Sequence, residues 1–351
     1  MKKNLLIILG SSLLILVMAL MPFFGACAPE PPPPPPPPPD EDEEPPPPPP
    51  KVYTVCITQI VTHPDLDNAR RGFIEKMEEL GYAEGVNIDY IMRNAAGDMS
   101  VNAAICEYFV SLKPDLILAI TTPCIQAMTA AAEGTDIPVV FTCVTDPVAA
   151  GVVPSWTESA PLITGVSDWN DITTQMEFIR GIFPFETLGI IYNAGEVNSV
   201  VQAEELVEKV APKLGFTVIE ATVAATIDVL GAAQSLVGRV DAMWIPTDNT
   251  AMAGIHSILK VAEENDIPFF GSTTSMAESG TVAGCGVNEY LLGKQAAVMA
   301  AKILSGEATP GDIPPEKGEQ FLYAVNLAAA ERMGVTIPQA VIDMADLVFE
   351  E

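Results

Sequence analysis

The sequence predicts an α/β protein of two lobes, each built on a doubly wound parallel sheet. Apolar runs too short for buried helices alternate with amphipathic segments, which is typical of strands covered by helices on both faces. The alternation occurs twice, from about residue 52 to 144 and again from about residue 188. Each series therefore predicts one open α/β sheet. Polar residues follow the strands in both series, so we expect a ligand cleft where the carboxyl ends of the two sheets face each other.

The first series is expected to contain four strands, each an apolar run bounded by polar or turn residues. One helix begins at His63 and closes at Gly81, and its early Asp65 and Asp67 favour a helix amino terminus. The expected strands are 52–58, 87–92, 115–120 and 139–144, and the expected helices are 63–81, 101–112 and 125–132.

Two consecutive strands of this series end in hydroxyl residues followed by proline. Thr121-Thr122-Pro123 follows one strand and Thr145-Asp146-Pro147 follows the next. Proline suits the first turn of a helix, where free N–H groups and threonine hydroxyls form an anion-binding cup. One such helix start is usually structural, but its repetition at neighbouring strand ends predicts a binding site.

The second series follows a loop at about residues 154–161. One of its strands ends in Thr247-Asp248-Asn249-Thr250, which is again polar. Its strands are expected at 188–192, 216–220, 241–246, 268–270 and 282–285, and its helices end at Leu214, Val237, Asn265, Leu304 and Met333.

The composition excludes several classes of function. The 351 residues carry a formal net charge of −29, which argues against nucleic acid or an anionic membrane surface as a partner. No Walker A, G-x-G-x-x-G or G-x-S-x-G motif is present. The carboxylates Asp146, Asp168 and Asp248 have no nearby histidine or lysine in the sequence with which to form an acid–base pair. We therefore expect a cleft that binds a ligand, with no enzymatic activity and no cofactor.

Cysteine and histidine give no sign of a metal site. Besides Cys27 there are five cysteines, none in a C-x-x-C pair, and only two histidines, His63 and His256. Cysteines within apolar runs are by default buried free thiols.

Residues 1–27 are interpreted as a lipoprotein signal segment. Lys2 and Lys3 precede the apolar run 5–20, and the segment ends in small residues before Cys27. This pattern resembles a bacterial lipobox, in which the cysteine is lipidated and becomes the mature amino terminus. The alternative is an uncleaved membrane helix. In the lipoprotein interpretation the protein lies on the extracytoplasmic face of the cell membrane, anchored by its lipid.

Residues 28–50 consist almost entirely of proline and acidic side chains. Such a segment cannot bury a core and is expected to be a stiff polyproline II linker. It would hold the folded part away from the membrane.

A dozen short motifs resemble one family, the tryptophan/tyrosine-type ABC transporter substrate-binding proteins, over about residues 52–340. The matching segments are Thr58-Gln59, His63-Pro64-x-Leu66-Asp67, Arg70-x-Gly72-Phe73, Gly81-Tyr82-x-Glu84-Gly85, Asn94-Ala95-x-Gly97-Asp98, Thr122-Pro123, Thr145-Asp146-Pro147-Val148, Thr164-Gly165-Val166-Ser167-Asp168, Tyr192-Asn193, Glu196, Asn198-Ser199 and Thr247-Asp248-Asn249-Thr250.

The resemblance implies a type I periplasmic-binding-protein fold, in which two Rossmann-like lobes joined by three hinge crossings close over a small ligand. It places lobe one at 51–166 plus 288–319 and lobe two at 167–287 plus 320–351, with crossings near 166–167, 286–287 and 322–323. It also implies a small amino acid as the ligand, expected to be aromatic (tryptophan, tyrosine or phenylalanine), and an ABC permease as the membrane partner.

A free amino acid requires partners for its carboxylate, its ammonium and its side chain. We expect the carboxylate at Thr122 and Thr145 with the helix-start N–H groups. Asp248 is the first candidate for the ammonium, with Asp168 and Asp146 as reserves. Asp248 could alternatively serve only as a helix cap.

The remaining candidates lie on the loops around the cleft. An aromatic side chain is expected against Tyr192 or Trp169, or beside the loop 59–63, and Asn198 and Ser199 either cap a helix or bond the ligand. The complete set of expected ligand-binding residues is Gln59, Thr121, Thr122, Thr145, Asp146, Asp168, Tyr192, Asn198, Ser199 and Asp248.

The sequence leaves open how the bound ligand is used. A transport receptor would deliver it to a permease, whereas a sensory module would present the ligand-bound state to a membrane receptor or kinase. A lipid-anchored enzyme is the third alternative, and the missing nucleophile–base pair argues against it.

Overall fold

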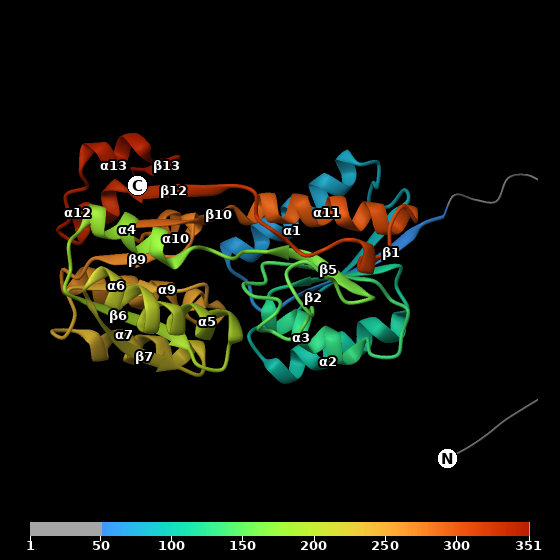
Figure 1. Ribbon diagram of the computed structural model, residues 1–351, viewed down its shortest axis with the longest axis horizontal. Helices are drawn as coiled ribbons and strands as arrows, with labels where there is room; N and C mark the ends of the chain where they lie inside the picture. Colours follow the sequence, from blue (N-terminus) through green and yellow to red (C-terminus); the bar gives the residue numbers. More distant parts are fainter. Residues whose placement is uncertain (1–50, 351) are drawn as a thin grey trace, which may run out of the picture. The chain divides into compact units, whose positions relative to one another are not determined.

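Two sheets, each flanked by helices, form the part of the chain that the computed structural model describes, residues 51–350 (Figure 1). The predicted α/β class with two doubly wound lobes is confirmed. Cys27 and the proline-rich segment lie outside the described residues, so the lipoprotein and linker assignments stay predictions. No helix within residues 51–350 is both long enough and apolar enough to cross a membrane.

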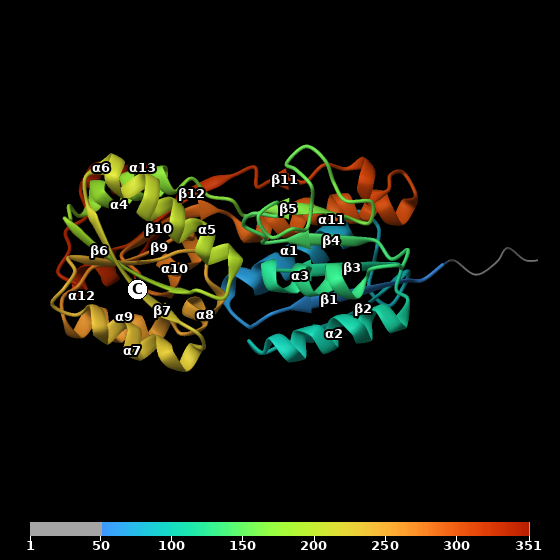
Figure 2. The same cartoon turned by 60° about the horizontal axis from the view of Figure 1, so that its bottom comes forward.

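The first sheet has six strands in the order β11-β5-β4-β3-β1-β2, and all neighbouring strands are parallel (Figure 2). Its strands are β1 (Tyr53–Gln59), β2 (Ile88–Asn94), β3 (Leu116–Ile120), β4 (Val139–Thr142), β5 (Ile163–Ser167) and β11 (Glu316–Lys317). Every residue of β3 is buried, because helices cover both faces of the sheet. Helices α1 (Pro64–Glu79) and α11 (Glu289–Ser305) lie on one face, and α2 (Met99–Leu112) and α3 (Thr122–Ala131) lie on the other (Figure 1).

The second sheet has seven strands in the order β13-β12-β10-β9-β8-β6-β7, and only the β10–β12 pair is antiparallel. Its strands are β6 (Thr187–Asn193), β7 (Thr217–Val223), β8 (Ala242–Ile245), β9 (Phe269–Gly271), β10 (Ala283–Val287), β12 (Phe321–Asn326) and β13 (Leu347–Phe349). The accompanying helices are α4 (Ile172–Ile182), α5 (Val197–Glu205), the π-helical turn η1 (Leu206–Val210), α6 (Ala211–Leu214), α7 (Val229–Leu236), α8 (Asn249–Ala253), α9 (Ile255–Glu264), α10 (Thr274–Ser279), α12 (Leu327–Arg332) and α13 (Gln339–Met344). Each sheet has its own hydrophobic core, so the two lobes are separate packing units.

The chain passes between the two sheets three times. It leaves the first sheet after β5 and returns at the start of α11, and it leaves again between β11 and β12. Hydrogen bonds connect the crossings to one another: the Val287 N–H donates to the Asn170 side chain at 2.9 Å, and the Gly318 N–H donates to the Ser167 carbonyl at 3.0 Å. Residues 322–323, expected at the third crossing, lie inside β12, and the crossing itself is at residues 318–320.

Several elements have no counterpart among the expected ones. They include β5, α4, α10, β11 and β12. The strand β5 has the sequence Ile-Thr-Gly-Val-Ser, in which polar and glycine residues interrupt the apolar run, yet all five residues are buried. The expected helix ending at Asn265 is divided into α8 and α9 at Gly254, where a side chain would meet Val229.

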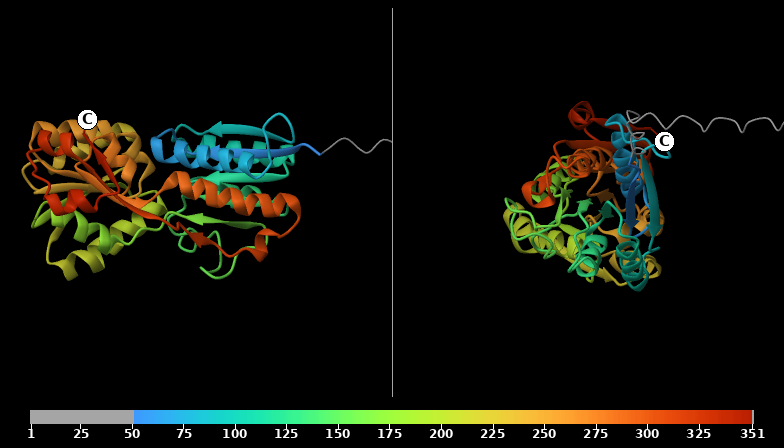
Figure 3. Two further views of the ribbon diagram at one scale, coloured as in Figure 1. Left: turned by 90° about the horizontal axis from the view of Figure 1, so that it is seen from above. Right: turned by 90° about the vertical axis from the view of Figure 1, so that its right-hand side faces the viewer.

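Helices α1 and α11 pack side by side along lobe one (Figure 3), and two glycines make this close approach possible. A Cβ atom at Gly293 of α11 would overlap the carbonyl oxygen of Ala69 in α1, and one at Gly72 would overlap the carbonyl oxygen of Tyr290. The helix that enters lobe one at the second crossing is thereby held against the helix that carries Asp65.

Replacing Gly293 by alanine is expected to destabilise the protein by about 1–3 kcal/mol, because the added methyl group must separate two packed helices. The matched control is Gly231→Ala in α7, where nothing lies within 4 Å of the new Cβ atom. There, the helix propensity of alanine should stabilise by about 0.5–1 kcal/mol. Denaturant unfolding of both variants measures the two changes in the free energy of unfolding. Changes of the same sign in the two variants would contradict the packing argument.

Candidate functional site

The polar ends of several strands from both lobes meet at one enclosed cavity. Lobe one contributes residues that follow β1, β3, β4 and β5, and lobe two contributes residues after β6 and β8 together with Met276. The lining residues are His63, Asp65, Leu66, Thr121, Cys143, Thr145, Asp168, Asn198, Thr247, Asp248, Asn249, Met252 and Met276. The cavity offers about 20 Å³ to the centre of a water-sized sphere, little more than the ~10–15 Å³ that one water needs. The lobes are therefore closed over it.

Two backbone positions in the lobe-one wall are conformationally unusual. Thr121 has φ 95° and Cys143 has φ 56°, and they directly follow β3 and β4. A positive φ is rare for residues other than glycine, above all for a β-branched threonine, and such positions cluster at binding sites. Thr121 lies at the start of α3, whose first N–H groups receive no bond from its side chain.

Five buried polar atoms on the cavity lining have no hydrogen-bond partner among the described residues. They are His63 Nδ1, Thr121 Oγ1, Thr145 Oγ1, Asp168 Oδ1 and Asn198 Oδ1. A buried polar group without a partner costs roughly 1–3 kcal/mol. Their convergence from both lobes makes this cavity the candidate ligand site.

Acidic side chains dominate the electrostatics of this region. Burial raises the pKa of Asp65 to about 7, with the Thr273 hydroxyl opposing the shift, and raises the pKa of Asp168 to about 6. The pKa of Glu289, at the start of α11, lies well above its usual range because of burial and the neighbouring Asp65. The Thr145 hydroxyl partly offsets the shift of Asp168, although no hydrogen bond of normal geometry joins the two groups. Neither lysine nor arginine lines the cavity, so a cationic ligand group would be stabilised there.

Direct hydrogen bonds join the lobes at two places. The Asp65 carboxylate of α1 accepts from the hydroxyls of Thr273, at 3.2 Å, and Ser275 in lobe two. His63 Nε2 lies 3.4 Å from the side-chain oxygen of Asn249. Both contacts exist only while the lobes are closed.

Asp248, the first candidate for the ammonium, has bonds to protein at both carboxylate oxygens. Oδ1 accepts from the Ala251 N–H at 2.6 Å and caps α8, and Oδ2 accepts from the Asn193 N–H at 2.6 Å. Burial, followed by the neighbouring Glu196, raises the pKa of Asp248 to about 7. Asp248 lines the cavity, but Asp168 is the carboxylate there with an unbonded oxygen.

The expected ligand-binding residues divide into two groups. Those that line the cavity are Thr121, Thr145, Asp168, Asn198 and Asp248. Those absent from its lining are Gln59, Thr122, Asp146, Tyr192 and Ser199.

Apart from Thr122, the residues of the second group have local partners that account for them. The Gln59 amide contacts Asp67 and Arg70 within lobe one, and Asp146 accepts from the N–H groups of Val148 and Ala149. Further partners are Tyr192 with Glu220, Ser199 with the carbonyls of Asn193 and Glu196, and Trp169 with Trp156 and Lys317. Thr122 is buried, and its hydroxyl has no partner.

Sequence reasoning missed His63, Asp65 and Glu196. His63 and Asp65 were assigned only to a helix start, and their contacts to lobe two are with residues 186 to 210 positions away. Glu196 belongs to one of the motifs that match the family, and its place in that motif is the signal that could have identified it.

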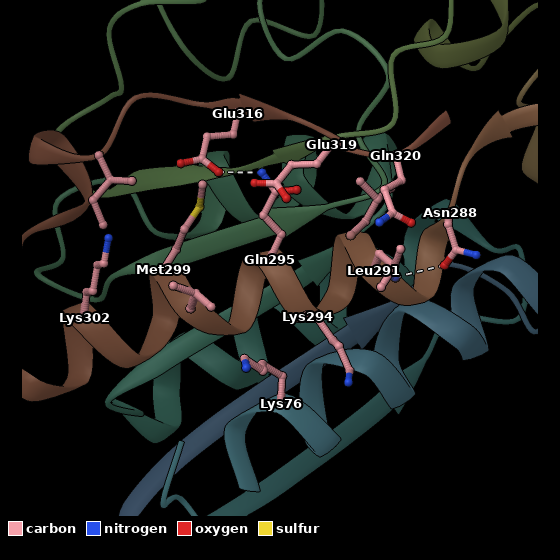
Figure 4. Close-up of a pocket in the computed structure, with 14 residues that line it drawn as sticks. Lys76, Asn288, Leu291, Lys294, Gln295, Met299, Lys302, Glu316, Glu319 and Gln320 are labelled. Atoms are coloured by element: carbon pink, nitrogen blue, oxygen red, sulfur yellow. Dashed lines mark hydrogen bonds between the residues drawn. The ribbon is translucent and has the colours of Figure 1, made fainter. Parts of the chain in front are cut away.

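A second hollow, on the outer side of α11, has a different character (Figure 4). Lys76, Lys294 and Lys302 line it together with Glu316 and Glu319, and none of the unpartnered buried atoms belongs to it. Its charged side chains reach solvent, so the candidate site is the cavity between the lobes.

Other kinds of site find no support within residues 51–350. No group of three or more histidine, cysteine or acidic side chains there is arranged to hold a metal ion. The five cysteines of this part of the chain are all buried free thiols.

Comparisons with known proteins identify one family. Residues 54–349 match the model of a family described as ABC transporter substrate binding protein. A tyrosine-binding protein of Clostridioides difficile is 39% identical over 265 residues, which are 75% of this chain and 76% of the relative.

Two solved structures show the same fold. One is an ABC domain from Streptococcus pneumonia in complex with L-Trp, with a TM-score of 0.81, 30% identity, and coverage of 85% of this chain and all of that chain. The other is the ligand-free, open structure of a substrate-binding protein from Clostridium difficile, with a TM-score of 0.64, 35% identity, and coverage of 86% and 100%.

The raised carboxylate pKa values make the closed, ligand-free protein sensitive to pH. A folded-state pKa above the usual value means that the folded protein binds more protons, so stability is gained as pH falls from about 8, through the raised folded-state pKa values, to about 4, the ordinary pKa of these carboxyl groups. His63 acts in the opposite direction, because burial lowers its pKa to about 4, and stability is lost as pH falls from about 6.5 to 4. Three carboxylates, Asp65, Asp168 and Asp248, oppose this one histidine, so we expect the melting temperature of the ligand-free protein to rise from about pH 8 to about pH 4, with His63 reducing the gain below about pH 6.5.

Asp65→Asn should reduce this pH dependence by at most about 1.36 kcal/mol per pH unit, the contribution of one titrating group. Asp146→Asn, at a carboxylate outside the cavity, is the control. Thermal unfolding over the pH series measures the slope, and an unchanged slope in Asp65→Asn would contradict the assignment.

Proposed function

Because the chain belongs to the ABC transporter substrate-binding protein family, we propose that it binds a free aromatic amino acid between its lobes and delivers it to a membrane permease. The relatives support an aromatic ligand, since one is named a tyrosine-binding protein and another was crystallised with L-Trp. The proposal rests above all on the five unpartnered polar atoms that both lobes direct into one cavity.

The cavity lining provides partners for all three parts of an amino acid. Asp168 Oδ1 is an acceptor for the ammonium, and it replaces Asp248 as the first candidate because its oxygen is unbonded. Thr121 and Thr145, with the free N–H groups at the start of α3, are donors for the carboxylate.

The apolar part of the lining suits an aromatic ring. Leu66 of lobe one and Met252 and Met276 of lobe two supply its apolar surface. Methionine is flexible and makes favourable sulfur–aromatic contacts, so these two side chains can adjust to rings of different size. This surface takes the place of Tyr192 and Trp169 as the expected ring contact.

We further infer that the structure has the closed arrangement of the lobes. Its similarity to the L-Trp complex is much greater than to the ligand-free open structure, although the identity to the open one is slightly higher. The difference between the two TM-scores therefore reflects the relative position of the lobes. Since the closed cavity is too small for an amino acid, the ligand enters after a hinge motion at the three crossings, and the side chains of the lining move apart to hold it.

Calorimetric titration of tryptophan, tyrosine and phenylalanine tests the ligand class. Asp168→Asn should weaken binding of these ligands at least tenfold, since truncating one member of a buried charge pair costs roughly 2–5 kcal/mol. The control is Asp146→Asn, which alters a carboxylate after the neighbouring strand that does not line the cavity. Absence of binding by all three amino acids would refute an aromatic ligand, and unchanged affinity in Asp168→Asn would remove Asp168 from the site.

We also propose that the protein is exported and anchored by a lipid at Cys27, which places it on the extracytoplasmic side of the cell membrane beside its permease. The sequence of residues 1–27 supports this assignment. The variant Cys27→Ala should abolish acylation and signal processing, as measured by metabolic labelling with a fatty acid. Continued labelling of the variant would show that another residue carries the lipid.

A further inference from the structure

Glu196 is a buried carboxylate that precedes α5 but bonds across to the start of α8. Its Oε2 atom accepts from the backbone N–H of Asn249 at 3.2 Å and from the side-chain Nδ2 of the same residue at 2.6 Å. Its Oε1 atom accepts from the N–H of Thr250 at 3.2 Å and from its hydroxyl at 2.7 Å. No ion pair to Glu196 occurs within residues 51–350, so polar donors alone stabilise it.

These bonds determine how two asparagine amides are oriented. A carboxylate that accepts from backbone N–H groups faces the NH₂ end of a neighbouring amide, because an anion can only accept. Asn249 therefore directs its oxygen away from Glu196 and towards His63. Asn198 donates through Nδ2 to Glu196 at 3.1 Å and to the Thr247 carbonyl at 2.8 Å, so its own oxygen faces the cavity.

The orientation of Asn249 determines in turn which nitrogen of His63 carries the proton. An amide oxygen next to Nε2 requires the proton on Nε2, and the other ring nitrogen is then a bare acceptor. His63 Nδ1 is the buried, unpartnered atom on the cavity lining. Burial also lowers the pKa of His63 to about 4, so the ring stays neutral at ordinary pH and Nδ1 keeps its lone pair.

His63 and Asp168 reach the cavity from strands that are well separated in the first sheet. His63 follows β1 and Asp168 follows β5, and these strands are three positions apart in the sheet order. At about 4.8 Å per strand, the ends of these two strands are roughly 14 Å apart. A ligand whose ammonium meets Asp168 therefore presents its opposite end to His63 and Asn198.

We propose that Glu196 is a positioning residue that makes this end of the cavity accept hydrogen bonds only, so that the site prefers ring systems carrying an O–H or N–H donor. The inference rests on the proposed function and refines its ligand class to tyrosine or tryptophan over phenylalanine. A site with buried acceptors rejects a ligand that leaves them unpaired, and we expect at least a tenfold preference.

The tautomer of His63 tests, without any ligand, whether Glu196 acts on His63 through Asn249. The chain has two histidines, so ¹⁵N nuclear magnetic resonance of the side chains, with His256→Gln for assignment, observes His63 individually. We expect the Nε2–H tautomer with no titration above about pH 5. Glu196→Gln, which allows the Asn249 amide to turn, should give a mixture of tautomers. An Nδ1–H tautomer in the wild type, or an unchanged tautomer in Glu196→Gln, would overturn the proposal.

Calorimetry with L-tyrosine and L-phenylalanine tests the consequence for selectivity. The wild type should prefer tyrosine at least tenfold, and Glu196→Gln should bring the ratio of the two affinities towards one. Asn249→Ala, which removes the link but leaves Glu196 its other donors, should have the same effect and replaces Glu196→Gln if that variant does not fold. Glu220→Gln, at the surface carboxylate bonded to Tyr192, is the matched control and should retain the wild-type ratio.

The two proposals can fail separately. If no aromatic amino acid binds, the proposed function fails. The tautomer of His63 still decides whether Glu196 makes this end of the cavity a hydrogen-bond acceptor. If both amino acids bind equally well to the wild type, the ligand class stands and the selectivity proposal is wrong.

Discussion

The three chain crossings are the constraint on which the rest of this structure depends. Each lobe has its own core, so the crossings and a few polar contacts hold the lobes together. The crossings are bonded to one another through Asn170 and Ser167, and the Gln175 amide donates to the carbonyls of Ser272 and Cys285 next to them. Motion is therefore confined to a hinge. Asp168 lies on the first crossing, so any bond that a ligand makes there acts directly on the hinge.

The cavity combines two requirements that normally conflict. Closing the lobes buries carboxylates without a basic partner, which is costly, and it also leaves several hydrogen-bonding atoms unsatisfied. Both costs fall when a molecule with an ammonium and further polar groups lies between the lobes. The empty closed state is thus poorly stabilised by its own interior, and the ligand supplies what the interior lacks.

The sequence was informative where local patterns decide the outcome. The apolar runs predicted the central strands β3, β4, β6 and β8, and the polar strand ends predicted Thr121, Thr145 and Asp248 on the cavity lining. It failed for β5, because burial of this strand comes from neighbours on both sides and not from an apolar pattern of its own. It also missed α4 and α10, although Asp171 caps the start of α4 by accepting from the N–H groups of Thr173 and Thr174, and Gly280 ends α10 in the left-handed conformation.

The rest of the site depends on contacts that no local pattern encodes. His63 meets Asn249, and Asp65 meets Ser275, only because two distant strand ends face each other. The sequence also could not predict which carboxylate has an oxygen free to bond a ligand. Asp248 and Asp168 both follow strands. Only the three-dimensional contacts reveal that both carboxylate oxygens of Asp248 accept from backbone N–H groups, whereas Asp168 has an oxygen without a partner.

The small volume of the closed cavity has a kinetic consequence. A ligand enclosed by both lobes has no exit while they stay shut, so its escape requires the inter-lobe contacts at Asp65 and His63 to break first. The dissociation rate then cannot exceed the rate of opening, however weak the contacts to the ligand itself. The residence time of the ligand in such a protein is determined by the contacts between the lobes. A membrane partner that pulls the lobes apart would release the ligand without competing for its binding groups.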